Sequence, residues 1–268
     1  MSTITVTATV ENSTGPLDVP RVRLNVTDTG TSPALFAATV TRLDPDGRVV
    51  PVRTTDGNPL VLTTSGTTRV GLLYDYEAPF QAPVTYSTME TPGSSSAAVT
   101  VAESKVWLIH PGVPELSMPI SVASVGNRTR SISQGVFRPM GRRSPVVQTD
   151  GQRKSPEGTL ELNTLTLAEA ARFEALTDDA GVLLLNVPAS FNWGLPTSYV
   201  ALGDIEEGRL VDYAPEPRRL HNLPYIIVDR PAGGSQSERT FIDLLAQFST
   251  LNAIRSAYPT LNAVLAGP

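Results

Sequence analysis

The chain has 268 residues, of which 40% are hydrophobic and 18% are charged, and its formal net charge at neutral pH is −5. This length favours two domains, and the hydrophobic content is sufficient for packed cores. The negative charge argues against nucleic-acid binding by the chain as a whole, and the absence of cysteine excludes disulfides, thiolate zinc sites and cysteine nucleophiles.

Residues 1–105 are predicted to form an all-β module. Apolar and polar residues alternate with a period of two, as in the segments beginning at Ile4 and Val22, which is typical of half-buried antiparallel strands. Turn residues such as Asp44-Pro-Asp-Gly47 separate these strands. This regular spacing of strands and turns predicts a β-sandwich. The polar corner and alternating strand around Tyr86 are similar to the late-strand corner of an immunoglobulin-like or fibronectin type III module.

Two acidic pairs of this module are candidate sites. Asp44 and Asp46 open a sequence similar to a calcium-binding loop, but its remaining oxygen ligands are missing, so we interpret the pair as part of a hairpin turn. Asp75 and Glu77 are two residues apart and would point to one side of an extended segment. We interpret them as solvated corner residues rather than as an acid–base pair.

Residues 106–235 are predicted to form a second domain. Its first segment is rich in proline and is expected to be extended, with Trp107 buried at the junction between the two domains. Thr166 and Glu169 form a capping box, which predicts a helix that ends near Gly181. The apolar stripe expected to face the core consists of Leu167, Ala170, Ala171, Phe173 and Leu176. Strands are expected before and after this helix.

The segment 128–154 is strongly basic. It contains seven of the 21 lysines and arginines against one acid, Asp150; the seven are Arg128, Arg130, Arg138, Arg142, Arg143, Arg153 and Lys154. Three interpretations remain open: a nucleic-acid patch, a solvated loop, or an interface with the acidic surface of another subunit. A nucleic-acid patch would usually contain aromatic residues interleaved with the basic ones. The acids of the turn at Asp204, Glu206 and Glu207 lack further metal ligands nearby. They are the natural counterpart of the basic loop across a subunit boundary.

Residues 236–268 are predicted to form short helices. Thr250-Leu-Asn-Ala-Ile254 recurs as Thr260-Leu-Asn-Ala-Val264, with a proline between the two copies. Helices of this length are unstable in isolation, so we expect them to dock on this chain or on a neighbour.

Nothing in the sequence predicts an enzyme. The two histidines, His110 and His221, lie in unrelated contexts, and no nucleophile elbow, phosphate loop, zinc motif or dinucleotide motif is present. We therefore expect no catalytic residue, no metal and no cofactor. We also expect a soluble, unexported chain, because no signal peptide and no apolar run of about 20 residues is present.

Several short motifs, in order along the chain, resemble those of minor tail and distal tail proteins from siphophages of actinobacteria. The matching text is Tyr74-Asp-Tyr-Glu-Ala-Pro79, Val84-Thr-Tyr86, Trp107-Leu-Ile-His-Pro111, Pro114, Gly141-Arg142, Pro145-Val-Val147, Thr149-Asp-Gly151, Gly158-Thr-Leu-Glu-Leu162, Tyr199-Val-Ala-Leu-Gly-Asp204 and the threonine-started repeats of the tail. One departure is that Leu251 and Leu261 stand where the resemblance leads us to expect aromatic residues.

The resemblance implies a fold and a role. The fold would be an immunoglobulin- or fibronectin-like sandwich, then a tail-tube-like β-barrel with one flanking helix, then short helices. The role would be that of a structural virion protein, made in the bacterial host cytoplasm, which forms a ring, commonly sixfold, that continues the tail tube and connects it to the tip proteins. The expected contact between subunits joins Arg138, Arg142, Arg143, Arg153 and Lys154 to Asp204, Glu206 and Glu207. The alternative is a receptor-binding tail protein that recognises host-surface carbohydrate.

Overall fold

The computed structural model describes residues 4–12, 18–29, 37–54, 59–65, 68–89, 95–211 and 215–232. Of the residues described, 52% lie in strands and 8% in helices, which confirms the prediction of a mainly β protein. The short helices predicted for residues 236–268 lie outside the described residues. Among the described residues, no helix has the length and apolar character that crossing a bilayer requires.

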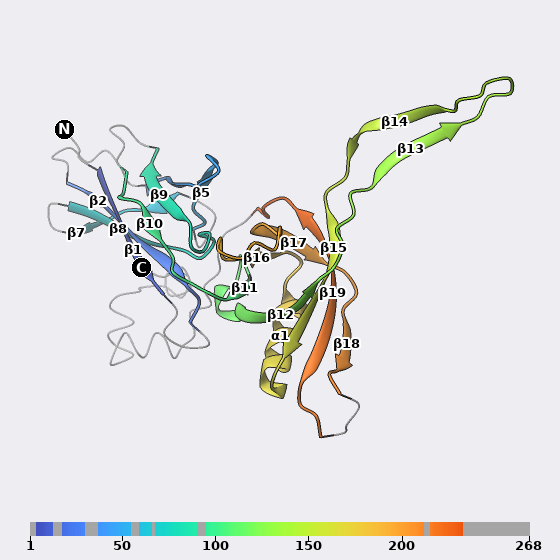
Figure 1. The fold of residues 1–268 in the computed structure, drawn as a ribbon. Helices are drawn as coiled ribbons and strands as arrows, with labels where there is room; N and C mark the ends of the chain where they lie inside the picture. The colour runs from blue at the N-terminus through green and yellow to red at the C-terminus, as the bar shows by residue number, and fades with distance from the viewer. Residues whose placement is uncertain are drawn as a thin grey trace.

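The first domain consists of two four-stranded antiparallel sheets that share one core (Figure 1). The first sheet has the order β1 (Ile4–Glu11), β2 (Arg21–Asp28), β8 (Thr68–Asp75), β7 (Thr63–Ser65). The second has the order β10 (Val99–Thr100), β9 (Pro83–Thr88), β4 (Val40–Leu43), β5 (Val49–Pro51). A further short pair joins β3 (Ala37–Ala38) and β6 (Leu60–Val61).

The predicted alternation explains how these sheets bury one face each. In β1, Ile4 and Val6 are buried while Thr5 and Thr7 are exposed. The inward side chains of β2 are fully buried, and they meet Tyr86 of the opposite sheet in the same core. The hairpin turn predicted at Asp44–Gly47 joins β4 to β5, and Gly47 takes the positive φ of 84° that glycine adopts without steric cost.

The second domain is a closed barrel of six strands. The order is β15 (Glu157–Thr164), β12 (Met118–Val125), β11 (Val106–Ile109), β16 (Leu183–Asn186), β17 (Ser198–Leu202), β19 (Arg219–Val228). The ring closes because β19 also pairs with β15 along its length. On its other side β19 pairs first with β18 (Glu206–Arg209) and then with β17. A 3₁₀ turn, η1 (Pro114–Leu116), connects β11 to β12.

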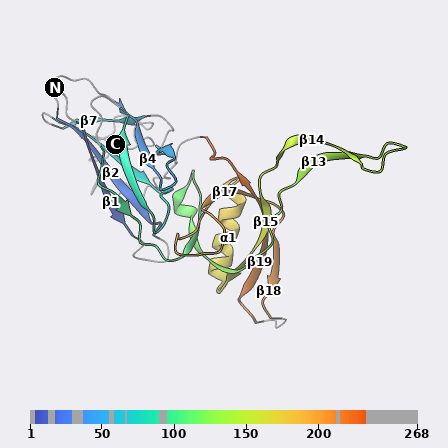
Figure 2. The same ribbon diagram turned by 45° about the horizontal axis from the view of Figure 1, so that its top comes forward.

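One helix, α1 (Leu167–Asp179), lies against this barrel (Figure 2). The N-cap of the predicted capping box is present, because the Thr166 hydroxyl accepts a hydrogen bond from the Glu169 amide at 3.1 Å. The Glu169 carboxylate accepts a hydrogen bond from the Leu165 amide at 2.7 Å, one residue before the N-cap. The predicted apolar stripe is wrong in its first half, because Leu167 is 59% exposed and only Phe173 and Leu176 are buried. The helix meets the core through its second half, so its first turn extends beyond that contact.

Buried His221 of β19 packs beneath this helix. Its ring centroid lies 4.6 Å from that of Phe173, and its Nε2 atom is 3.1 Å from the Thr164 hydroxyl. Burial lowers the pKa of His221; nearby Glu207 acts in the opposite direction, and Arg219 lowers the pKa further. The folded barrel therefore favours the neutral imidazole.

This pKa shift predicts a loss of stability on acidification. The unfolded chain takes up a proton at His221 near its ordinary pKa of about 6.5, more readily than the folded chain does. This contribution to stability is present above that pH and is lost as the pH falls below it. We expect urea-unfolding free energies measured from about pH 7.5 to 5 to fall less steeply for His221→Gln than for the wild type; equal slopes would contradict the assignment.

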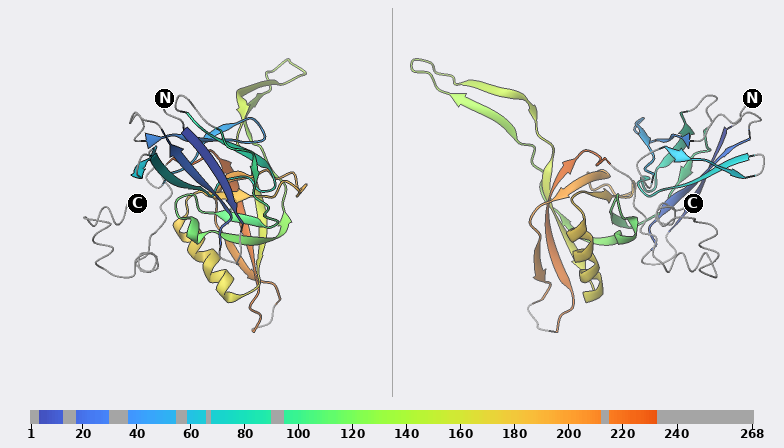
Figure 3. Two further views of the ribbon diagram at one scale, coloured as in Figure 1. Left: turned by 90° about the vertical axis from the view of Figure 1, so that its left-hand side faces the viewer. Right: turned by 180° about the vertical axis from the view of Figure 1, so that it is seen from behind.

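Residues 132–153 form a long β-hairpin, whereas a solvated loop was one of the three interpretations that the sequence left open. Strand β13 (Ile132–Phe137) pairs with β14 (Val146–Arg153), and the pairing contains a β-bulge between Ile132 and Gln134. Figure 3 shows the hairpin projecting away from the barrel, on the side remote from the first domain. Backbone pairing therefore joins the two sides of this segment up to its tip.

Candidate functional site: a projecting hairpin and a buried interdomain junction

The projecting hairpin carries apolar side chains on both of its faces. Val136 pairs with Val147, and the next pair, Phe137 and Val146, points to the opposite face because side chains alternate along a strand. All four are 40–56% exposed. A two-stranded hairpin is only marginally stable by itself in water, so a surface of this kind is typical of a segment that another molecule covers.

The tip of the hairpin is a tight turn. The Arg142 amide donates a hydrogen bond of 3.3 Å to the Pro139 carbonyl, and Gly141 takes a φ of 83°, the conformation that the third residue of a type II turn needs. Between them, the Met140 side chain is fully exposed. The tip therefore presents a flexible apolar side chain, of the kind that adapts to irregular binding surfaces.

Basic side chains surround this apolar surface. Arg138, Arg142 and Arg143 lie at the tip, and Arg153 and Lys154 lie at the base. None of the five forms an ion pair with a residue that the structure describes; Arg153 donates only to the Arg130 carbonyl, at 3.2 Å. The positive charge is thus not neutralised within the described part of the protomer.

The acidic residues predicted to face this charge lie elsewhere in the protomer. Glu206 and Glu207 are in β18, which pairs with β19 on the barrel wall, and Asp204 lies two residues before this strand. Glu207 forms an ion pair with Arg219 at 2.9 Å, and Glu206 accepts a hydrogen bond of 3.4 Å from Asn222. Two of the three acids are therefore engaged within the barrel, and the predicted pairing stays a prediction about separate subunits.

Trp107 lies in β11 and is 1% exposed. Its indole belongs to the core of the first domain, together with Ile109 and Leu184 of the barrel. The indole Nε1 atom has no hydrogen-bond partner among the described residues. The structure thus places this side chain where the two domains meet.

Asp75 and Glu77 are buried, which contradicts their interpretation as solvated corner residues. They are 2% and 4% exposed. Asp75 accepts hydrogen bonds from the Arg42 guanidinium at 2.9 Å, from the Tyr86 hydroxyl at 2.9 Å and from the Glu77 amide at 2.9 Å. Buried carboxylates need partners of this kind, because desolvation otherwise outweighs their attraction to a counter-charge.

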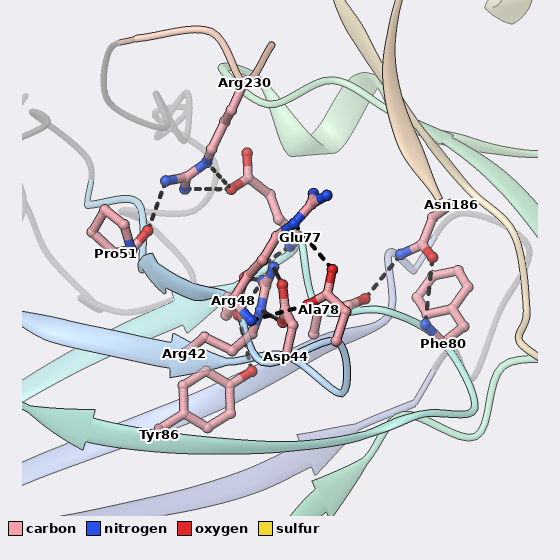
Figure 4. Close-up of polar contacts among 12 residues, drawn as sticks. Arg42, Asp44, Arg48, Pro51, Glu77, Ala78, Phe80, Tyr86, Asn186 and Arg230 are labelled. Carbon is pink, nitrogen blue, oxygen red and sulfur yellow. Dashed lines mark hydrogen bonds and ion pairs between the residues drawn. The ribbon is translucent and has the colours of Figure 1, made fainter. Parts of the chain in front are cut away.

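Glu77 joins the two domains through two arginines, of which Figure 4 labels Arg230. Arg53 of the first domain donates to one carboxylate oxygen at 3.0 Å, and Arg230, just beyond β19 of the barrel, donates to the other at 2.9 Å. Each arginine also reaches the backbone of the opposite domain: Arg53 donates to the Pro231 carbonyl at 2.9 Å, and Arg230 to the Pro51 carbonyl at 2.7 Å. Glu77 is therefore the centre of an interdomain network, here called the clamp, that consists of Glu77, Arg53, Arg230 and the Pro51 and Pro231 carbonyls.

A second polar contact lies beside the clamp. Asn186 of β16 donates to the Ala78 carbonyl at 2.9 Å and accepts from the Phe80 amide at 3.4 Å (Figure 4). The Ala189 amide donates to the Phe80 carbonyl at 3.1 Å. The segment that follows Glu77 is thus bonded along its backbone to the barrel.

The charges of this junction support one another. Burial alone would lower the pKa of Arg42, but the Asp75 and Asp44 carboxylates outweigh this effect and hold the pKa well above its ordinary value. Burial raises the pKa of the Tyr86 phenol, and Asp75 raises it further. The guanidinium therefore stays charged and the phenol stays a neutral donor, which suits a structural network.

The sequence gives little sign of this network. Glu77 and Arg230 are separated by 153 positions, and Asp75 and Arg42 by 33. The only local signal is the sequence from Asp75 to Pro79, which ends a strand with two acids and a proline. Within the described ranges, no three histidine, aspartate or glutamate side chains are grouped as metal ligands.

No family model matches the sequence, and a search among curated proteins finds no match.

Proposed function

We propose that this chain is a structural protein of a phage tail tip, whose copies assemble into a ring that continues the tail tube and connects it to tip components. The observation that carries the proposal is the projecting hairpin, with exposed apolar side chains on both faces and basic side chains that lack acidic partners among the described residues. Such a surface favours burial against another subunit.

Two further features support this role. A closed barrel with one flanking helix is the architecture that the resemblance to tail proteins implies for residues 106–235. In the first domain, two four-stranded antiparallel sheets share one core, which is in keeping with an immunoglobulin- or fibronectin-like sandwich as a decoration of the tail. In this proposal the protein is not an enzyme.

A ring requires a heterologous contact, in which one surface of each copy meets a different surface of the next. The contacts at Glu77 would then hold the first domain at one position around that ring. Native mass spectrometry at micromolar protein and averaged electron micrographs test the assembly. The proposal would be contradicted if the protein were a monomer at every salt concentration and also failed to bind other tail components.

Charge reversal at the hairpin tip gives a sharper test. We expect Arg142→Glu/Arg143→Glu to weaken assembly by about tenfold to a hundredfold, because rim charges each contribute up to about 1 kcal/mol. Raising the salt concentration should weaken the wild-type assembly as well, since screening acts on exposed charges. The association constant is measured by sedimentation velocity.

The control is Arg48→Glu, which reverses an exposed charge of the first domain. It should leave the association constant unchanged. Equal association constants for the tip variant and this control would mean that the tip is merely solvated.

A further inference from the structure

An apolar groove of about 410 Å³ opens on the barrel beside the start of α1. It lies over the paired strands β12 and β15, and the segment that follows β16 forms its other wall. Its apolar lining consists chiefly of Ile120, Val122, Leu162, Leu165, Phe191 and Trp193. All the residues that line it belong to the described part of the chain.

The groove is unusually apolar for a solvent-facing surface. Leu165 is 56% exposed and Trp193 is 42% exposed, and the Trp193 ring lies 4.8 Å from that of Phe191. An occupant with apolar side chains would cover this exposed apolar area.

The helix beside the groove is acidic on its exposed face. Glu169, Glu174, Asp178 and Asp179 are all exposed, while Arg172 is the only basic residue of α1. In β18, Glu207 and Glu206 are bonded to Arg219 and Asn222. On α1, the Glu169 carboxylate accepts a hydrogen bond from the Leu165 amide, and the Asp179 carboxylate lies 3.3 Å from His110 Nε2. The groove lining itself contains one acid, Glu169, and one base, Lys105, and the excess of negative charge lies along the exposed face of α1 beside the groove.

We propose that this groove receives the hairpin tip of a second copy of the chain. The proposal rests on the proposed ring assembly and names the surface that accepts the hairpin. Met140 and Phe137 would lie against Trp193 and Leu165, and the tip arginines would lie against the acidic face of α1.

The geometry requires the second copy. The hairpin of a protomer projects away from its own α1 in every view (Figures 1, 2 and 3), so it does not reach its own groove. The hairpin and the groove are different surfaces of one chain, which makes the contact heterologous and allows a rotation to close it into a ring.

Photo-crosslinking tests the proposal on the full-length protein. Leu165→p-benzoylphenylalanine places the reactive group in the groove at an exposed position. Two matched probes replace other exposed residues: Val211, which follows β18, and Val61 of the first domain. Mixing ¹⁵N-labelled with unlabelled protein separates crosslinks between copies from those within one chain, and mass spectrometry identifies the captured peptide.

We expect the Leu165 probe to capture residues 131–154 of another copy at least about tenfold more than either matched probe, because docking raises the local concentration of the hairpin. Phe137→Ser/Met140→Ser should abolish this capture. Capture of residues 233–268, capture of the hairpin by the Val211 probe instead, or no capture in a sample that native mass spectrometry shows to be assembled would overturn the proposal and leave the ring intact. A sample that is monomeric throughout would overturn the ring and, with it, this docking site.

Discussion

Glu77→Gln is expected to lower the free energy of unfolding by about 3–5 kcal/mol, the cost of breaking a buried ion pair by removing one partner. The amide keeps the size of the side chain but leaves Arg53 and Arg230 without their shared anion. Both arginines are mostly buried, at 7% and 23% side-chain exposure, so water replaces the lost charge poorly.

The matched control is Glu11→Gln. Glu11 also pairs with two arginines, Arg21 at 2.7 Å and Arg23 at 3.6 Å, but its side chain is 31% exposed. Surface pairs contribute about 1 kcal/mol or less, so this change should be small. Equal losses for the two variants would show that the junction has no special role in stability.

The shape of the unfolding curve gives a second readout. With the clamp intact, we expect both domains to unfold in one transition, because backbone and side-chain contacts from each reach the other. In Glu77→Gln, two transitions should separate. Both measurements are made in dilute protein at high salt, where assembly does not add to the apparent stability.

The parts of this fold that were predicted from the sequence are those with local signals. Thr166 and Glu169 are three residues apart, so the capping box and the start of α1 were visible in the sequence. The alternation in β1 and β2 likewise identified half-buried strands. Barrel closure through the pairing of β15 with β19 has no such signal, because its partners are about sixty residues apart.

The hairpin and the buried Glu77 network were missed for opposite reasons, whereas the burial of Trp107 at the junction was predicted. In the hairpin, both faces are exposed, so Val136 and Phe137 follow one another without the alternation that marks a half-buried strand. At the junction, Glu77 is charged and adjoins a proline corner, which is typical of solvent exposure. Its burial depends on Arg53 and Arg230, and only the tertiary fold brings these together.

Removal of the outer hairpin is expected to abolish assembly and to leave the fold intact. Gln134 and Thr149 are direct partners, so an Asn-Gly turn between them can replace residues 135–148 and keep the register. The change removes the exposed apolar side chains of both faces and of the tip. Burying even two such side chains contributes about 3 kcal/mol or more, so the association constant should fall by more than about a hundredfold.

The same variant separates assembly from folding, because none of the deleted residues belongs to either core. Its unfolding free energy, measured as a monomer, should therefore stay within about 0.5 kcal/mol of the wild type, as for surface changes in general. A companion variant, Val136→Thr/Val147→Thr, keeps every charge and removes apolar area from one face only. If assembly persists without the hairpin, the surface between copies lies elsewhere on the barrel. If Val136→Thr/Val147→Thr, which keeps every charge, also weakens assembly, then burial of apolar area contributes to holding the copies together.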